Sequence, residues 1–362
     1  MIGADEIIAK IKRDGHLTGG DLTGIDLSRR DLTRVILEGV QMPGANLEEA
    51  KLSDSALIRV NLAGARMVGA DLTGGRLDNV DLTGARMEKA ILTNVTLQNV
   101  SLIGTDLSET DLSNAFADQC DFSHARCIGA NLFRASLQGC RLHALDVTAA
   151  DLTRLLALDS DFTGVVFNKT DLTKAFLGKS TFGKQNFSGC TLKLTIFDKS
   201  LLQGADFSGL DLTQTSFGGA DLTAARLTNS SGKHIIFNEI VAPGADFSEA
   251  DFFMVNFSKA HLTGAIFHRA RIEQSLFSDS RLDKCDFRQA GAPYTDFSRA
   301  VVTGADFSDA RLNRANFHRV RRREARWDGA HTETIYKTDP KLWAAESWAA
   351  PERRSQRRDK HE

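Results

Sequence analysis

Carboxylate side chains recur along the 362-residue chain at spacings that could assemble a cation site. Asp111, Asn131, Asp151 and Asp171 follow one another at intervals of 20 residues, so a fold with that repeat would stack them on one side. Their oxygen atoms suit calcium. No glycine-rich calcium-binding nonapeptide accompanies them, however, and the same residue types recur with the structural period described below. We therefore expect a solvated polar face and no metal site.

The five cysteines could act as nucleophiles, metal ligands or disulfide partners. They are Cys120, Cys127, Cys140, Cys190 and Cys285. An odd number in a long chain argues against a disulfide framework. None of the nine histidines lies at metal-ligand spacing from a cysteine. All five fall on positions that the repeat turns inward, so we predict small, reduced core side chains, although a disulfide between Cys120 and Cys140 on adjacent coils is conceivable.

Motifs for catalysis and cofactor binding are missing from the sequence, which has no phosphate-binding glycine loop, hydrolase elbow or zinc-helix motif. We therefore expect neither an enzyme nor a cofactor. The 45 Lys and Arg nearly balance the 47 Asp and Glu, which argues against direct nucleic-acid binding. Arginines gather at 321–326 and 353–358, but residues 321–362 hold 11 basic against 8 acidic side chains, which favours a solvated terminus.

The composition is typical of a soluble folded protein, with 42% hydrophobic and 25% charged residues. No stretch approaches the roughly 18 consecutive apolar residues of a membrane span, and the chain does not begin with a basic segment followed by an apolar one. We expect a cytoplasmic protein that does not enter a membrane. Secretion without a cleavable signal peptide stays open.

A five-residue period organises most of the chain. Every fifth position from Leu17 to Phe317, the centre of each repeat, is large and apolar with few exceptions: among 61 such positions, 31 are Leu and 18 are Phe. The residue two places earlier is usually small, the residue just before the centre is often Asp or Asn, and the residue two places after it is often Gly. A period of five fits neither a helix nor a flat strand, so each repeat must turn a corner and direct two side chains inward.

Units such as Ala70–Gly74 (ADLTG) and Ala205–Gly209 (ADFSG) resemble the A-[DN]-L-x-x repeat of the pentapeptide-repeat family. The resemblance extends over most of the chain in one unbroken register. It implies an all-β fold, a right-handed quadrilateral β-helix with four repeats per coil and about 15 coils in a chain of this length. It also implies a rigid interaction surface without catalysis.

Coils of four repeats predict that residues 20 apart stack, and the phenylalanines follow this rule. One column consists of Phe197, Phe217, Phe237, Phe257, Phe277, Phe297 and Phe317. A second column, ten residues out of phase, runs from Phe167 to Phe307 and is broken by Leu227. We therefore predict two buried aromatic columns on opposite sides of a continuous core, because stacked rings add to burial energy.

The ends of the chain depart from the period. The predicted parts are 1–14, an N-terminal helical cap; 15–330, the β-helix; 331–350, a C-terminal cap that is partly helical; and 351–362, a disordered charged tail. Ile7, Ile8 and Ile11 would lie on one face of the first helix and cover the first coil. Within the rod, small centres at Gly232 and Ala242 predict a local bulge or a bend.

The family resemblance implies protein binding in one of two forms. One branch of the family mimics duplex DNA, binds DNA gyrase and confers quinolone resistance, which requires a strongly negative rod. Residues 1–320 carry 34 basic and 39 acidic side chains, a charge of only −5, which weakens this alternative. Other relatives are accessories or effectors of bacterial secretion systems, including type VI secretion. We favour a non-catalytic protein-binding scaffold or adaptor, with the type VI role as one form and gyrase or topoisomerase binding as the alternative.

Apolar residues at positions that should point outward mark a candidate contact surface. Leu156, Phe176, Ile196 and Ile236 lie just before repeat centres on one side of the predicted coil, and Leu194 lies beside Ile196 at the corner. An exposed apolar ladder indicates a partner, a self-association surface or a tail folded against it. We predict that these five residues contact a protein of unknown identity, a second copy or the C-terminal segment. Scattered surface hydrophobes are the alternative.

Overall fold

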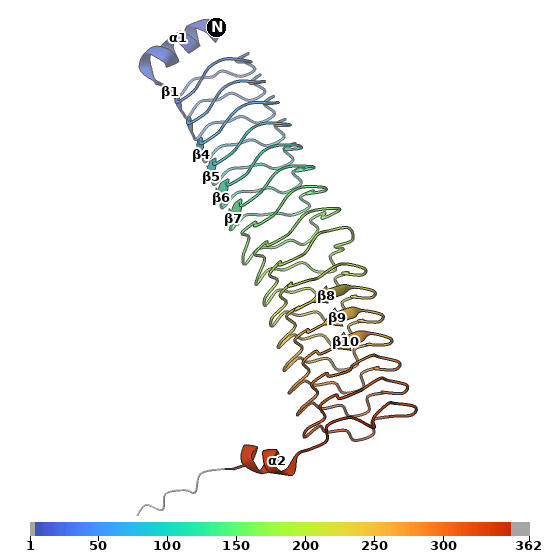
Figure 1. Cartoon of the computed structure of the whole chain (residues 1–362). Helices are drawn as coiled ribbons and strands as arrows, with labels where there is room; N and C mark the ends of the chain where they lie inside the picture. The colour runs from blue at the N-terminus through green and yellow to red at the C-terminus, as the bar shows by residue number, and fades with distance from the viewer. Residues whose placement is uncertain (1–3, 349–362) are drawn as a thin grey trace, which may run out of the picture.

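The computed structural model describes residues 4–348, which form a long rod of stacked coils with a short helix at each end (Figure 1). Helix α1 (Ala4–Asp14) lies at the N-terminal end, and helix α2 (Pro340–Glu346) follows the last coil. The predicted all-β solenoid with short helices is confirmed. The charged tail predicted for 351–362 lies outside the described residues.

Each coil contains 20 residues, because backbone partners lie 20 positions apart along the rod. Asp71, for example, bridges Lys51 on one neighbouring rung and Ile91 on the other. The backbone N–H of Asp71 donates to the carbonyl of Ala50 at 2.9 Å. The next N–H, that of Leu72, donates in the opposite direction to the carbonyl of Ile91 at 2.7 Å. Hydrogen bonds in both directions satisfy the backbone of each rung without long strands.

Two sides of the rod contain strands of three residues, whereas the other rungs are single bridges. The seven-stranded sheet comprises β1 (His16–Thr18), β2 (Ile36–Glu38), β3 (Ala56–Ile58), β4 (Arg76–Asp78), β5 (Thr96–Gln98), β6 (Phe116–Asp118) and β7 (Ser136–Gln138). The three-stranded sheet comprises β8 (Ser231–Lys233), β9 (Asp251–Phe253) and β10 (Arg271–Glu273). Neighbouring strands pair in parallel, and the two sheets lie on different sides of the rod (Figure 1).

A residue in the left-handed backbone region makes each corner, two places after the repeat centre. Gly74 has a φ of 66° there, and Lys179 has 57°. Glycine adopts this conformation without the Cβ strain of other residues, which explains its frequency at this position. The aspartate before the centre supports the turn: Asp21 Oδ1 accepts from the hydroxyl and the backbone N–H of Thr23, at 2.6 and 3.0 Å. These bonds hold the pKa of Asp21 below its usual value.

The two aromatic columns lie in the core where the 20-residue recurrence predicts them. Phe257 is fully buried and stacks on Phe237 at 4.8 Å and on Phe277 at 4.7 Å between ring centroids. The second column meets the first edge to face, as where Phe267 contacts Phe257 at 5.7 Å and 85°. Stacking along each column and T-shaped contacts between them are the favoured aromatic geometries.

The small centres do not interrupt the rod. At Gly232, a Cβ would come within 2.9 Å of the Cδ1 atom of Ile235, so the buried Ile235 side chain occupies the space that a larger centre would need. Parallel bridges continue through Asp211 and Ser231 and through Val241 and His261. The core is therefore refilled from a neighbouring position without a break in the ladder, where the sequence predicts a bulge or bend.

The two ends of the rod are closed differently. Ile7, Ile8 and Ile11 of α1 are buried against the first coil. At the other end the ladder continues past residue 330 to Tyr336, and Trp327 stacks on Phe307 at 4.6 Å. Helix α2 buries no side chain. Ion pairs connect it to the rod instead, with Glu346 bound to Arg299 and Arg319 at 3.4 and 2.6 Å.

Candidate partner-binding surface

The polar residues that could do chemistry serve the rungs. Asp111 Oδ1 accepts from the Nδ2 atom of Asn131 at 3.0 Å and from the backbone N–H of Ser113 at 2.9 Å. Within residues 4–348, no three His, Cys, Asp or Glu side chains gather as a metal site would require. The stacked carboxylates are therefore engaged in hydrogen bonds along and between the rungs.

All five cysteines are free, buried thiols. Burial raises the pKa of Cys127 to about 12 and that of Cys190 to about 11. A thiol with such a pKa holds almost no thiolate at neutral pH and is a poor nucleophile. Cys120 and Cys140 lie on adjacent rungs, where a hydrogen bond with Cys120 and burial together raise the pKa of Cys140. The thiols therefore behave as small core side chains.

The five residues predicted to bind a partner fall on one side and one corner of the rod. Bridges join Leu156 to Phe176 and Phe176 to Ile196, so these three lie on consecutive rungs. Leu156 and Phe176 are 36% and 44% exposed, whereas Ile196 is half-buried. Leu194, also exposed, lies at the corner next to Ile196, and Ile236 is exposed two rungs further on. We call these five residues the apolar strip.

The structure divides the strip and also extends it. Ser216, between Ile196 and Ile236, is buried, so Ile236 is separated from the other members. Exposed Leu158 lies two places after Leu156, and Phe116 and Leu276 occupy the same side of other coils. The 20-residue spacing could have identified Phe116 and Leu276 from the sequence, because both differ from Leu156 by a multiple of 20.

Other sides of the rod also expose apolar side chains. Ile91, Val166, Leu201 and Val241 are each 40–45% exposed, and none is bridged to another exposed apolar residue. They fit the pattern of scattered surface hydrophobes, which need no partner. Leu156 and Phe176 differ because two large exposed side chains stand on bridged rungs.

Basic side chains border the strip at both corners. Arg154 and Lys174 precede Leu156 and Phe176 by two residues, and Lys179 and Lys199 follow at the opposite corner, all of them exposed. Lys179 Nζ lies 4.0 Å from a carboxylate oxygen of Asp159. Arg154, Lys174 and Lys199 have no carboxylate within 4.0 Å in the described part of the chain. The strip is thus an apolar ladder between two positive edges.

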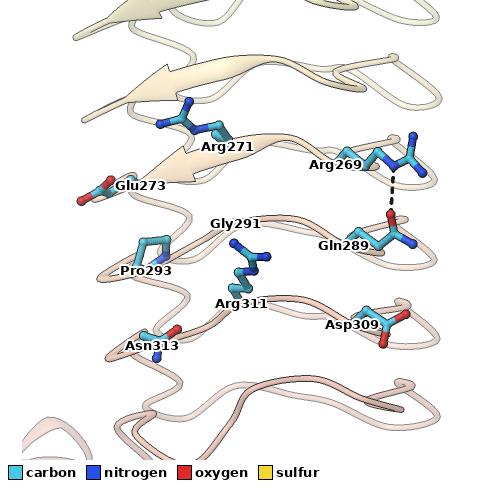
Figure 2. A pocket seen from close by; sticks show the side chains of 9 residues that line it. All are labelled: Arg269, Arg271, Glu273, Gln289, Gly291, Pro293, Asp309, Arg311 and Asn313. Atoms are coloured by element: carbon cyan, nitrogen blue, oxygen red, sulfur yellow. Dashed lines mark hydrogen bonds between the residues drawn. The ribbon is translucent and has the colours of Figure 1, made fainter.

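A hollow of about 620 Å³ lies on another side, near the C-terminal end of the rod (Figure 2). It extends over three rungs, with Gly291 between Arg271 and Arg311 (Figure 2). Gln289 borders it at one edge, where its Oε1 atom accepts from the Nε–H of Arg269 at 2.9 Å, and Pro293 borders the other edge. The hollow exists because glycine places no side chain on the middle rung.

The repeat sequence and the ladder geometry together define the class of protein. A family model for pentapeptide repeats matches the chain in eight copies. The matched residues are 16–48, 44–79, 76–114, 90–126, 118–154, 197–229, 244–279 and 280–319. The chain therefore belongs to the pentapeptide repeat family, as its resemblance to the A-[DN]-L-x-x unit predicts.

Among solved structures, the chain is similar to HetL, a pentapeptide repeat protein involved in heterocyst differentiation regulation from the cyanobacterium Nostoc sp. strain PCC 7120. The identity is 17%, with 94% of this chain and 98% of HetL covered and a TM-score of 0.20. It is also similar to QnrB1, a plasmid-mediated fluoroquinolone resistance protein, at 19% identity over 52% of this chain and 96% of QnrB1, with a TM-score of 0.35. No curated protein matches the chain. Neither helix within residues 4–348 has the length and apolar character needed to cross a bilayer.

Proposed function

We propose that this protein is a non-catalytic scaffold or adaptor that binds a protein partner through the apolar strip. The observation that supports this most directly is the exposure of Leu156 and Phe176 on consecutive rungs. Side chains on a hydrogen-bonded ladder are held in place before binding, so association orders few groups and loses little conformational entropy. Burial of two or three such side chains would supply the apolar centre of an interface.

The charged borders of the strip specify the chemistry of the partner. Arg154 and Lys174 on one edge and Lys179 and Lys199 on the other would attract carboxylates at the rim of an interface. The complementary surface is a segment with apolar side chains along its middle and Asp or Glu on both flanks. Four rungs separate Leu156 from Ile236, a distance of roughly 19 Å at the usual strand spacing. A short helix or extended segment could cover that length.

Two more specific roles fall within this proposal. A secretion-system accessory, including one for type VI secretion, is a rigid cytoplasmic adaptor of this kind. Gyrase or topoisomerase binding by DNA mimicry is the alternative, and it requires dense negative charge along the rod. Arginines on the flat sides offset that charge, as in the pairs Arg126–Asp106 at 3.2 Å and Arg226–Asp206 at 3.9 Å. The charge distribution therefore favours the adaptor, and a gyrase supercoiling assay with the purified protein separates the two.

Replacement of both Phe176 and Ile196 by Ser tests the proposal. A pull-down from lysate of the native host, followed by binding measurements with the captured protein, should show weaker association for the double variant. Stability should change little, because substitution of exposed side chains usually alters the free energy of unfolding by no more than about 0.5 kcal/mol. Half-buried Ile196 is expected to account for most of any loss.

The matched control replaces Ile91 and Val166 by Ser. These residues are as exposed as Phe176 but lie singly on other sides of the rod. Their variant should bind the captured protein as the unmodified chain does. The proposal fails if both double variants lose binding equally, or if the Phe176 and Ile196 variant keeps its partner while unfolding at much lower denaturant concentration.

A further inference from the structure

Arginines on the flat sides of the rod follow a simple pairing rule. Where an arginine stands just before a repeat centre and an aspartate stands 20 residues earlier, the two form an ion pair across adjacent rungs. The pairs are Arg126–Asp106, Arg141–Asp121, Arg226–Asp206, Arg271–Asp251 and Arg326–Asp306, with N–O distances of 3.2–3.9 Å. The previous rung thus supplies the anion that each guanidinium faces.

Arg311 breaks this rule. The residue 20 places earlier is Gly291, with which it is bridged, so no carboxylate stands where the pattern puts one. Arg311 has no ion pair within residues 4–348. A Cβ built on Gly291 would meet no atom within 4 Å, so the place of the missing side chain is open space. Arg271 borders that space from the rung on the other side, and its pair with Asp251 is long, at 3.4 Å (Figure 2).

We propose that the hollow over Gly291 is a binding site for an oxyanion, a carboxylate or a phosphoryl group. The oxyanion would occupy the position of the missing aspartate and accept N–H bonds from Arg311, with Arg271 opposite. Guanidinium groups present planar pairs of donors that match carboxylate and phosphate oxygens. The site lies on a different side from the apolar strip, so this inference does not depend on the proposed function.

The rest of the lining limits the ligand. Glu273 and Asp309 stand at the edges of the hollow, so a large polyanion would meet repulsion there. The Oε1 atom of Gln289 is already engaged by Arg269, which leaves the amide nitrogen of Gln289 as a further donor. The arrangement therefore suits a single anionic group on a small ligand or a side chain.

The experiment follows the Nε–Hε resonances of arginine in the full-length, ¹⁵N-labelled protein. Inorganic phosphate and succinate are titrated separately, with sodium chloride adjusted to keep the ionic strength constant. At least one of the two should produce saturable shifts at Arg311 and Arg271. Saturation with phosphate alone assigns the site to a phosphoryl group, saturation with succinate alone assigns it to a carboxylate, and saturation with both assigns it to either oxyanion.

Two variants and one control make the test specific. Gly291→Asp restores the missing carboxylate, so it should shift the Arg311 resonance without ligand and abolish the saturable response. Arg311→Gln should also abolish the response at Arg271. Arg281→Gln is the control, because Arg281 also has no ion pair within the described residues but is bridged to His261 and Val301, whose side chains leave no such hollow.

The proposal is overturned if neither probe gives saturation. It is equally overturned if the Arg281 resonance responds as strongly as that of Arg311, since that would be nonspecific attraction to surface charge. Undiminished binding by the Gly291→Asp variant would exclude the position proposed for the oxyanion. Circular dichroism checks that each variant keeps the fold, which exposed positions should allow.

Discussion

The rod has two regions that share one backbone lattice but have different cores. From Leu17 to Ala157 the centres are mostly aliphatic, whereas from Phe162 to Phe317 aromatic rings predominate. The bridges keep the same 20-residue register in both regions. The hydrogen-bonded ladder and the small inward residues therefore define the coil, and the large side chain at the centre can be aliphatic or aromatic within it.

Coupling between coils distinguishes the two regions. In the aromatic region each ring stacks on rings above and below it, as Phe257 does on Phe237 and Phe277. In the aliphatic region a centre such as Leu77 packs without directional contacts of this kind. The aromatic region should therefore lose more stability when one side chain is removed.

Phe257→Ala is expected to have the largest effect. Loss of a buried ring costs about 3–5 kcal/mol through lost burial and the remaining cavity, and here it also removes two stacking contacts. Leu77→Ala in the aliphatic region should cost about 2–5 kcal/mol, towards the lower end because a leucine leaves a smaller cavity. Denaturant unfolding of both variants, monitored by circular dichroism, measures the difference. Equal losses would show that stacking adds no coupling.

Alkaline pH should destabilise both regions through their buried thiols. The pKa of Cys127 in the aliphatic region is raised by burial from 9.0 to about 12, and that of Cys285 in the aromatic region is also raised by burial. A raised pKa in the folded state means that the contribution to stability is complete below pH 9 and is lost as the pH approaches 12. Unfolding measured between pH 8 and 11 should show a smaller loss in Cys127→Ala and in Cys285→Ala than in the unmodified protein.

Those thiol variants also test accessibility. A thiol reagent should modify the native protein slowly at both sites and rapidly after unfolding, because both side chains are buried. If either cysteine reacts quickly in the native protein, its region opens locally. The comparison would then concern the dynamics of the two regions as well as their packing.

The corners should give the smallest effect. Gly84, in the aliphatic region, has a φ of 65° and open space around its missing Cβ, so Gly84→Ala introduces only backbone strain, roughly 1–2 kcal/mol. Lys284, in the aromatic region, has a φ of 58° and already bears that strain. Lys284→Ala should therefore change the free energy of unfolding by less than about 0.5 kcal/mol. Similar losses for the two variants would rule out strain as the cause.

Most of the fold could be predicted from the sequence because the period is local and unbroken. The alternation of small and large residues fixes which side chains point inward, and the recurrence of Phe257 and its neighbours at 20 residues fixes the size of the coil. How the core adjusts at Gly232 could not be predicted. That depends on Ile235, which lies outside the set of centres and turns its side chain into the vacant space.

The surface was less predictable, because exposure depends on neighbours as well as on repeat position. Phe176 and Ile196 occupy equivalent positions, yet only Phe176 is exposed and Ile196 is half-buried. The hollow at Gly291 could have been suspected from the sequence, since Asp stands 20 residues before five other arginines and Gly stands before Arg311. Its significance becomes clear only when the ion pairs across the rungs are known.

The 20-residue register also determines how this protein can change in length. An insertion of 20 residues adds one coil, which moves everything beyond it by roughly 4.8 Å along the axis without rotation. An insertion of five residues turns everything beyond it by about a quarter of a revolution, since four repeats complete a coil. The angle between the apolar strip and the Gly291 hollow could therefore be changed in quarter-turn steps, by adding single repeats between Ile236 and Arg271.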